Sequence, residues 1–541
     1  MDLILYGGKI VTMDPAQPYA QALAIQDGVI RAVGRNEDIL PLARAGTRQI
    51  NLGGRLLLPG FCDSHMHLLS YGYGLEKAAL GDARSLDDLI RIGCDFLARN
   101  PDAAWIQGRG FNNDDWADKR LPTRHDLDRI STEIPISFTR ICSHTVVVNS
   151  KALQLMGAGR GMPQPEGGSI EFDENGEPNG IFRDTAQNLV YAAVPHPTLR
   201  DVRRMLVNAG RDALRCGLTS VHTDDYEALT EREYPLLLDA YFGLAREGKL
   251  PVRVYEQCRL HRMDLLQDFL AAGHTTGQGD SLFKIGPFKL LCDGGLGART
   301  ALLSRPYADS PETLGHAVYT QDELDSLVAT AHNAGMPSAL HTIGDGSLDM
   351  CLDAIGRAAE RNPRPELRHS VIHCQVTRPD QLRRLRDMGL IAHIQPIFID
   401  YDHRFVSARL GAEREQDSYN WRTMADLGIH YACGSDSPVE SFDVLRGIAC
   451  AVTRMGQDGQ PPGGWLPQQA LTVEQAVYGY TMGGAYAACE ERIKGSLTAG
   501  KLADMVVLDR DIFTTPPGEI KDAQVDMTVM GGALVWQRTD M

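Results

Sequence analysis

The segment LLLPGFCDSHMH, residues 56–67, reads as a strand that ends in two histidines, the first of several such strands that define the fold. His65 and His67 are two residues apart, and the period of a strand sends both imidazoles to the same face. Two histidines spaced in this way can share one metal ion. An isolated pair is more often two core or surface histidines, so the rest of the chain must decide between these interpretations.

Strand-like and helix-like stretches alternate after this segment. Seven further strands are predicted at residues 218–225, 251–258, 283–294, 337–344, 370–375, 391–396 and 430–436. Before one predicted helix Thr320 and Glu323 form a capping-box pair, and Gly335 lies where that helix should stop. Alternation of strand and helix predicts a parallel sheet, and eight repeats predict a closed (β/α)8 TIM barrel. The fold class is α/β, with the barrel over residues 56–489.

The two ends of the chain carry short alternating apolar runs joined by glycine turns. Residues 3–13 and 23–34 both read as hairpins, the second with a turn at Asp27-Gly28. Runs near the C-terminus, at 503–511 and 525–537, look the same. Neither end has enough strands to bury a face alone. We therefore expect one composite β-sandwich built from residues 1–55 and 490–541.

The gap between the first two barrel strands, residues 70–215, is far longer than an ordinary loop. It predicts an insertion subdomain within the barrel.

Composition limits the partners and the compartment. A net charge of −16 argues against binding to nucleic acid, which requires clustered lysine and arginine. Eleven cysteines without a CxxC pair are typical of a reducing cytoplasm. The first residues lack the pattern of a signal peptide, and no run of about 18 apolar residues predicts a membrane span. We expect a cytoplasmic protein that acts on a small molecule, with a homodimer as the default oligomer.

Five of the predicted strands end in side chains that can bind metal. After the two histidines of the first strand come Lys289, His341, His373 and Asp436, each near the carboxyl end of its strand. In (β/α)8 enzymes that end of the barrel is the catalytic face. Taken singly, each reads as a core histidine, a solvated lysine or a turn aspartate. Together, in strand order, they predict a metal site.

The blocks that carry these residues resemble the signature blocks of the amidohydrolase superfamily. The matching segments are PGFCDSHMH (59–67), KLLCDGGLGART (289–300), LHTIGD (340–345), VIHCQ (371–375) and GSDSPVES (434–441). More narrowly the chain is similar to amidohydrolase family 3, the group of N-substituted formamide deformylases and YtcJ-like hydrolases. The resemblance covers nearly the whole chain, including SHTVVVNSKAL at 143–153 and GSLTAGKLADMVVLD at 495–509.

The resemblance implies a binuclear metal centre, most simply of Zn²⁺. His65, His67 and Asp436 would bind one ion, and His341 and His373 the other. Lys289 would bridge them after reacting with CO2 to give an anionic carbamate, because an ammonium group cannot bind a cation. Burial favours the neutral amine that this reaction needs. The alternative is an unmodified Lys289 and a single ion held by His65, His67, His341 and Asp436.

This centre predicts hydrolysis of a non-peptide carbon–nitrogen bond, in an N-formyl or N-acyl amine or a cyclic amide. Metal lowers the pKa of bound water from 15.7 toward roughly 7, which supplies hydroxide at neutral pH. Asp436 is the expected general base. The resemblance places His144 of the insertion over the barrel mouth, where it would hydrogen-bond the substrate carbonyl, although a purely local role is equally open.

The sequence leaves two other functions open, each with a feature that argues against it. A deaminase of an aminated heterocycle would typically carry a glutamate three residues after His341, where this chain has Gly344. A non-catalytic relative would typically have lost a metal ligand, and every ligand position is filled. A dinucleotide-binding fold is disfavoured because no GxGxxG follows an early strand.

Overall fold

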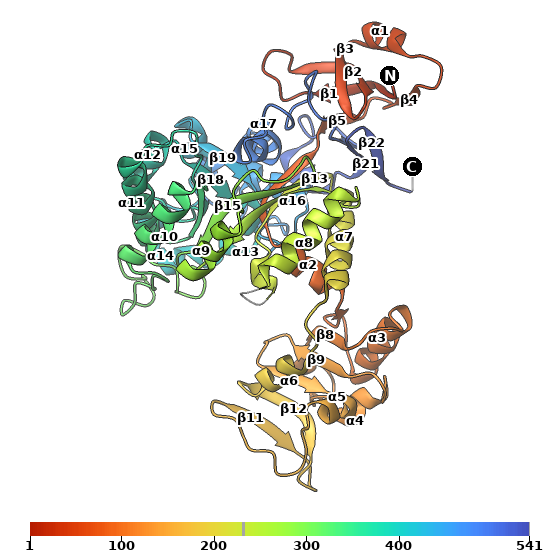
Figure 1. Ribbon diagram of the computed structural model, residues 1–541, viewed down its shortest axis with the longest axis vertical. Helices are drawn as coiled ribbons and strands as arrows, with labels where there is room; N and C mark the ends of the chain where they lie inside the picture. Colours follow the sequence, from red (N-terminus) through yellow and green to blue (C-terminus); the bar gives the residue numbers. More distant parts are fainter. Residues whose placement is uncertain (230–232, 540–541) are drawn as a thin grey trace. The chain divides into compact units, whose positions relative to one another are not determined.

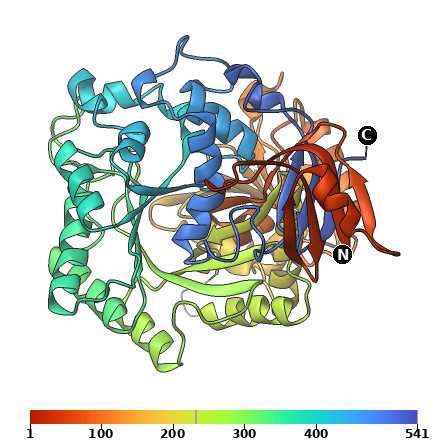
Figure 2. The same ribbon diagram turned by 90° about the horizontal axis from the view of Figure 1, so that it is seen from above.

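A computed structural model of the chain describes residues 1–229 and 233–539, and its central element is a barrel of eight parallel strands (Figures 1 and 2). In spatial order the strands are β6 (Phe61–Met66), β13 (Leu218–Thr223), β14 (Arg253–Arg259), β15 (Phe283–Leu291), β16 (Ser338–Thr342), β17 (Ser370–His373), β18 (Ile391–Ile394) and β19 (His430–Cys433). Each strand falls within, or within one residue of, a stretch predicted from the sequence. The α/β barrel fold is therefore confirmed.

Helices follow most of the barrel strands and lie outside them (Figure 2). They are α8 (Tyr234–Arg246), α9 (Met263–Ala271), α10 (Gln321–Asn333), α11 (Asp345–Arg361), α12 (Pro379–Asp387), α15 (Trp421–Asp426) and α16 (Val444–Thr453). Helix α10 begins as predicted: Thr320 Oγ1 accepts from the backbone N–H of Glu323, whose carboxylate accepts in turn from the N–H of Thr320. Gly335 follows its end with φ +86°, a conformation that favours glycine.

The segment that we predicted as one strand is divided between two sheets at Gly60. Residues Leu56–Pro59 form β5 in the terminal sheet, and β6 begins at Phe61. The Gly60 N–H donates to the carbonyl of Asp504 in the terminal sheet, whereas the Phe61 N–H donates to the carbonyl of Gly217 beside the barrel. A Cβ at Gly60 would lie 2.3 Å from Oγ1 of Thr219, so only glycine fits at this crossing.

Both ends of the chain contribute to one eight-stranded sheet. Its strands run in the order β22 (Ala533–Gln537), β21 (Val525–Met530), β20 (Met505–Leu508), β5, β1 (Leu3–Val11), β2 (Tyr19–Gln26) and β3 (Val29–Gly34), and β4 (Arg48–Asn51) also pairs with β1. Buried side chains from both ends, among them Leu23, Leu57 and Val507, pack into one core. The last two residues of the predicted C-terminal range, 540–541, lie outside the described residues.

The prediction of a hairpin at residues 3–13 is wrong. Residues Leu3–Val11 form a single strand, β1, whose pairing with β2 is irregular between Tyr6 and Ile10. Gly7 has φ +70°, and a Cβ there would lie 2.6 Å from Oδ1 of Asn51. The glycine pair therefore bends one strand instead of reversing the chain. The second hairpin is present, with positive φ at both Asp27 and Gly28.

The chain divides into two compact units, residues 72–205 and the remainder. The smaller unit has a six-stranded sheet in the order β11 (Gly168–Phe172), β12 (Pro178–Asp184), β10 (Thr145–Val148), β9 (Ile136–Arg140), β8 (Ile106–Phe111) and β7 (Ala78–Ala79). Helix α3 (Leu86–Arg99) packs Leu89 and Phe96 into a core of its own. In neither unit does a described helix combine the length and apolar character that crossing a membrane requires.

Replacement of Gly60 by alanine tests the crossing between the sheets. The added methyl group meets both γ atoms of Thr219, at 2.3 and 2.5 Å, so rotation of that side chain cannot relieve the overlap. We expect Gly60→Ala to lower the free energy of unfolding by about 1–3 kcal/mol, measured by urea denaturation. The control is Gly518→Ala, where a Cβ would meet no atom within 4 Å. Equal stability of the two variants would contradict the account.

Candidate metal centre

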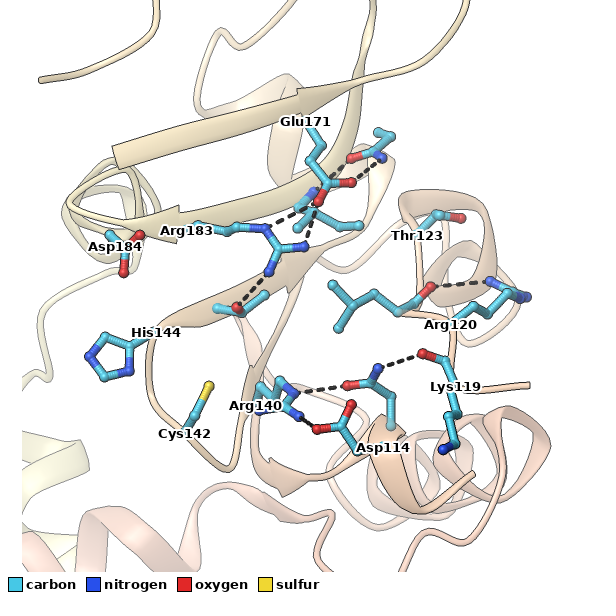
Figure 3. Close-up of a pocket in the computed structure, with 15 residues that line it drawn as sticks. Asp114, Lys119, Arg120, Thr123, Arg140, Cys142, His144, Glu171, Arg183 and Asp184 are labelled. Atoms are coloured by element: carbon cyan, nitrogen blue, oxygen red, sulfur yellow. Dashed lines mark hydrogen bonds and ion pairs between the residues drawn. The ribbon is translucent and has the colours of Figure 1, made fainter. Parts of the chain in front are cut away.

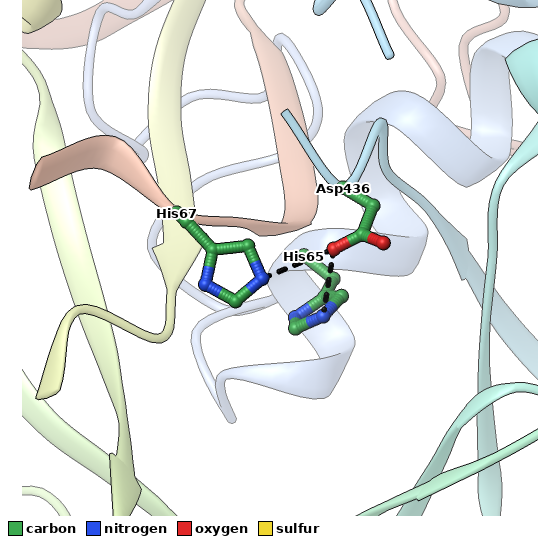
Figure 4. Close-up of side chains that lie close together, drawn as sticks. All are labelled: His65, His67 and Asp436. Carbon is green, nitrogen blue, oxygen red and sulfur yellow. Dashed lines mark hydrogen bonds and ion pairs between the residues drawn. The ribbon is translucent and has the colours of Figure 1, made fainter. Parts of the chain in front are cut away.

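Three of the predicted ligands form a tight group at the rim of the barrel (Figure 4). His65 lies on β6, His67 follows that strand directly, and Asp436 lies three residues beyond β19. Oδ1 of Asp436 is 3.4 Å from Nε2 of His65 and 3.2 Å from Nε2 of His67. One carboxylate oxygen therefore faces both imidazoles, although 369 residues separate Asp436 from His67.

The other three predicted ligands lie beside this group. Nζ of Lys289, on β15, is 3.5 Å from Nε2 of His65. The ring of His373, at the end of β17, lies 5.6 Å from the ring of His65 and 4.5 Å from that of His341 on β16, centre to centre. All but His67 are buried, and His67 is partly buried. The structure thus brings all six side chains together.

Every histidine of the group has its Nδ1 atom held by an oxygen acceptor. The partners are Oε1 of Gln257 for His65 (2.7 Å), the backbone carbonyl of Asp224 for His67 (2.7 Å), Oδ1 of Asp293 for His341 (3.0 Å) and Oε1 of Gln395 for His373 (2.8 Å). An acceptor at Nδ1 fixes the proton there and leaves the lone pair on Nε2.

The two glutamines are themselves oriented by the backbone. Nε2 of Gln257 donates to the carbonyl of Ser64, and Nε2 of Gln395 donates to the carbonyl of His393. The amide oxygen of each side chain must therefore face its histidine. These residues were not predicted from the sequence. Their only signal was a polar side chain near the end of a buried strand.

Electrostatics prepare this group for a cation. Burial lowers the pKa of His65 and His373 well below the ordinary value, and lowers the pKa of His341 to about 3, so these rings are neutral. Burial alone would raise the pKa of Asp436, but its contacts with the imidazoles of His65 and His67 outweigh burial and hold that pKa well below its usual range. Neutral imidazoles with an ionised carboxylate are the ligands that Zn²⁺ prefers. The residues present therefore fit a divalent metal.

Lys289 differs from a surface lysine. Its side chain is buried, and burial lowers the pKa of the amine to about 8 despite the opposing effect of Asp224 and Asp436. A larger fraction of the amine is therefore neutral near pH 7 than for an exposed lysine.

A second group of candidate ligands, His67, Asp224 and Glu227, overlaps the first. Nδ1 of His67 already donates to the backbone carbonyl of Asp224, and Glu227 forms an ion pair with Arg259. The His67 nitrogen on that side therefore carries a proton, and the group is a poor metal site.

His144 lies in the smaller unit, on the wall of an open cavity of about 730 Å³ (Figure 3). Arg140, Cys142 and Arg183 line the same cavity. The arginines are paired, Arg140 with Asp114 and Arg183 with Glu171. The catalytic role of His144 stays a prediction.

A parallel barrel that gathers histidines, a lysine and an aspartate at its carboxyl rim defines a class of metal-dependent hydrolases, and comparison with known proteins agrees. The profile of the amidohydrolase family matches residues 48–536. The chain is 33% identical to the putative amidohydrolase YtcJ of Bacillus subtilis over the whole of both chains. It is 27% identical to the N-substituted formamide deformylase of Arthrobacter pascens over 99% of each.

A solved structure agrees with these sequence matches. An uncharacterized metal-dependent hydrolase from Pyrococcus furiosus superposes with a TM-score of 0.78 at 30% identity, over 95% of this chain and all of that one. This protein belongs to the amidohydrolase family, whose members generally use a divalent metal.

Replacement of Asp436 by asparagine tests the carboxylate in this group. The change removes the negative charge that faces both histidines but keeps the backbone N–H of residue 436, which donates to the carbonyl of His65. We expect at least about a tenfold loss of bound zinc after dialysis, measured by elemental analysis, with an unchanged circular dichroism spectrum. Asp402→Asn is the control, because Asp402 is a partly buried carboxylate that contacts Tyr419 and Gln375 and none of the six residues. Retention of zinc by Asp436→Asn would contradict the site.

Proposed function

We propose that the protein hydrolyses a non-peptide carbon–nitrogen bond of a small molecule, such as an N-formyl or N-acyl amine or a cyclic amide. The observation that carries the proposal is the convergence of four imidazoles, Lys289 and the ionised Asp436 at one rim of the barrel. Likeness to a relative named N-substituted formamide deformylase supports an amide-type substrate.

Two Zn²⁺ ions are the proposed occupants. His65, His67 and Asp436 would hold one, and His341 and His373 the other. Lys289 would bridge them as a carbamate. The position of its Nζ beside Nε2 of His65, its burial and its lowered pKa support this role. When bound, the metal supplies a Lewis acid that polarises the substrate carbonyl and makes water acidic enough to attack at neutral pH.

Asp436 is the proposed general base. Its Oδ1 faces the two histidines, whereas Oδ2 has no hydrogen-bond partner among the residues that the structure describes. That oxygen is free to accept the proton of the attacking water and to pass it to the leaving nitrogen, which departs only when protonated. The low pKa of the carboxyl keeps it ionised and ready to accept.

Phe398 provides an apolar wall to the centre. Its ring stacks on the ring of His373 at 5.9 Å, with an angle of 18° between their planes. An aromatic side chain here excludes water from one side of His373 and strengthens the electrostatic interactions within the site.

Two features of the chain argue against a deaminase. A Cβ at Gly344 would lie 1.9 Å from the carbonyl oxygen of Leu302, so no side chain fits where such enzymes typically carry a glutamate. The neighbouring Asp345 cannot take its place, because its carboxylate is bound by Ser304 and Arg378.

Chemical rescue of Lys289→Ala tests the proposal. We expect this variant to lose nearly all hydrolysis in a screen of N-formyl amines, N-acyl amines and cyclic amides. Added acetate or propionate should restore part of it, because a free carboxylate supplies the two oxygens that the carbamate would supply. Asp436→Asn is the matched variant that these acids should not rescue. A Lys289→Ala protein with activity within threefold of the parent would refute the bridging role. Absence of hydrolysis by the parent across the whole panel would refute the proposed bond type.

A further inference from the structure

The acceptors behind the four histidines are not equivalent. His65 and His373 have an amide oxygen behind them, and His67 has a backbone carbonyl. Among the described residues, His341 alone has Nδ1 hydrogen-bonded to a carboxylate, that of Asp293. The Glu227 carboxylate is 3.9 Å from Nδ1 of His67, beyond hydrogen-bond distance. Asp293 lies two positions after the end of β15, and its side chain is fully buried.

The carboxylate of Asp293 accepts four hydrogen bonds. Oδ1 accepts from Nδ1 of His341 at 3.0 Å and from the N–H of Ile343 at 3.1 Å. Oδ2 accepts from the N–H of Gly344 at 2.8 Å and of Leu302 at 3.1 Å. The side chain thereby ties together the segments that follow β15 and β16, and it aims the His341 ring.

The charge of this carboxylate needs a cationic partner. Within the described part of the chain, no lysine or arginine pairs with Asp293, and its donors are three neutral backbone groups and one imidazole. A buried carboxylate is costly unless positive charge compensates it. His341 is the side chain through which a cation can compensate Asp293, because its Nδ1 bonds the carboxylate and its Nε2 faces the ion that it would hold.

We propose that Asp293 is the positioning residue that sets the affinity of the His341 position for its metal, through a carboxylate–histidine–metal relay that the other three histidines lack. This inference rests on the proposed function, because it concerns the same metal centre. A carboxylate behind a histidine makes the opposite nitrogen a stronger donor and fixes the direction of its lone pair. The ion at His341 should consequently depend on Asp293, whereas an ion held by His65, His67 and Asp436 should not.

Titration of metal-free protein with Co²⁺ tests the inference without an activity assay. The parent and Asp293→Asn are compared by equilibrium dialysis and by the visible spectrum of bound cobalt. Asparagine has one oxygen for the four donors and no charge. We expect one binding step of the variant to weaken about 10- to 100-fold, with an altered cobalt spectrum for that step.

The matched control is Asp345→Asn. Asp345 is also buried and also ties the segment after β16 to its neighbours, through Ser304 and Arg378, but it contacts no predicted ligand. This variant should bind Co²⁺ as the parent does, so any general loosening of the loop is separated from the relay.

The outcomes distinguish the two proposals. A parent that takes up Co²⁺ while Asp293→Asn matches it within twofold at every step would overturn the inference alone. A parent that takes up no divalent ion would overturn the proposed function and the inference with it. If Asp293→Asn does not fold, Gln395→Glu tests the same relation in reverse: a carboxylate behind His373 should tighten one step several-fold, and unchanged or weaker binding would overturn the inference.

Discussion

The site depends on the seam where the first and last barrel strands meet. The N–H of Asp436 donates to the carbonyl of His65 at 2.8 Å, and the N–H of His67 donates to the carbonyl of Ser437 at 2.7 Å. Beneath them the buried carboxylate of Asp63 accepts from the N–H of both His65 and Ser435. These bonds join the ends of β6 and β19, and they therefore hold Asp436 beside the two histidines. Without the seam, the barrel would supply imidazoles but no carboxylate.

Two of the predicted metal ligands, Asp436 and His373, have an unusual backbone conformation. Asp436 has φ +60° and His373 has φ +77°. Residues other than glycine seldom adopt these backbone conformations, each of which costs of order 1 kcal/mol or more. The strain persists because surrounding contacts hold both residues. Gln395 holds the His373 ring, and the backbone bond to His65 holds Asp436. In both residues the strain directs a side chain into the metal centre.

Much of this arrangement was predictable from the sequence. Apolar runs bounded by turns located all eight barrel strands, and the resemblance of short blocks to a known family identified the six side chains that the rim gathers. The sheet change at Gly60 was not predictable, because it depends on Thr219, which lies 159 positions away. The sequence predicts a turn at Gly7, because a glycine pair is compatible with a turn and with a bend inside a strand. Only the pairing of β1 with β4 and β5 shows that the strand continues through the pair.

The acceptors behind the histidines were missed for a related reason. Asp293 and Gln395 follow strands that neighbour those of their histidines, whereas Gln257 lies on β14, two strands away from β6, so these roles appear only once strand order and register are fixed. The partner of His67 is a backbone carbonyl, which no side-chain pattern can reveal. Sequence thus identified the groups that would touch a metal, whereas the groups that aim them emerged from the fold.

Anomalous diffraction at the zinc edge, from crystals of protein purified without chelators, would locate the metal ions themselves. We expect one peak bounded by His65, His67 and Asp436, a second beside His341 and His373, and electron density that extends beyond Nζ of Lys289. A map with no peak at this rim, or with a bare lysine amine turned away from the peaks, would refute the binuclear centre.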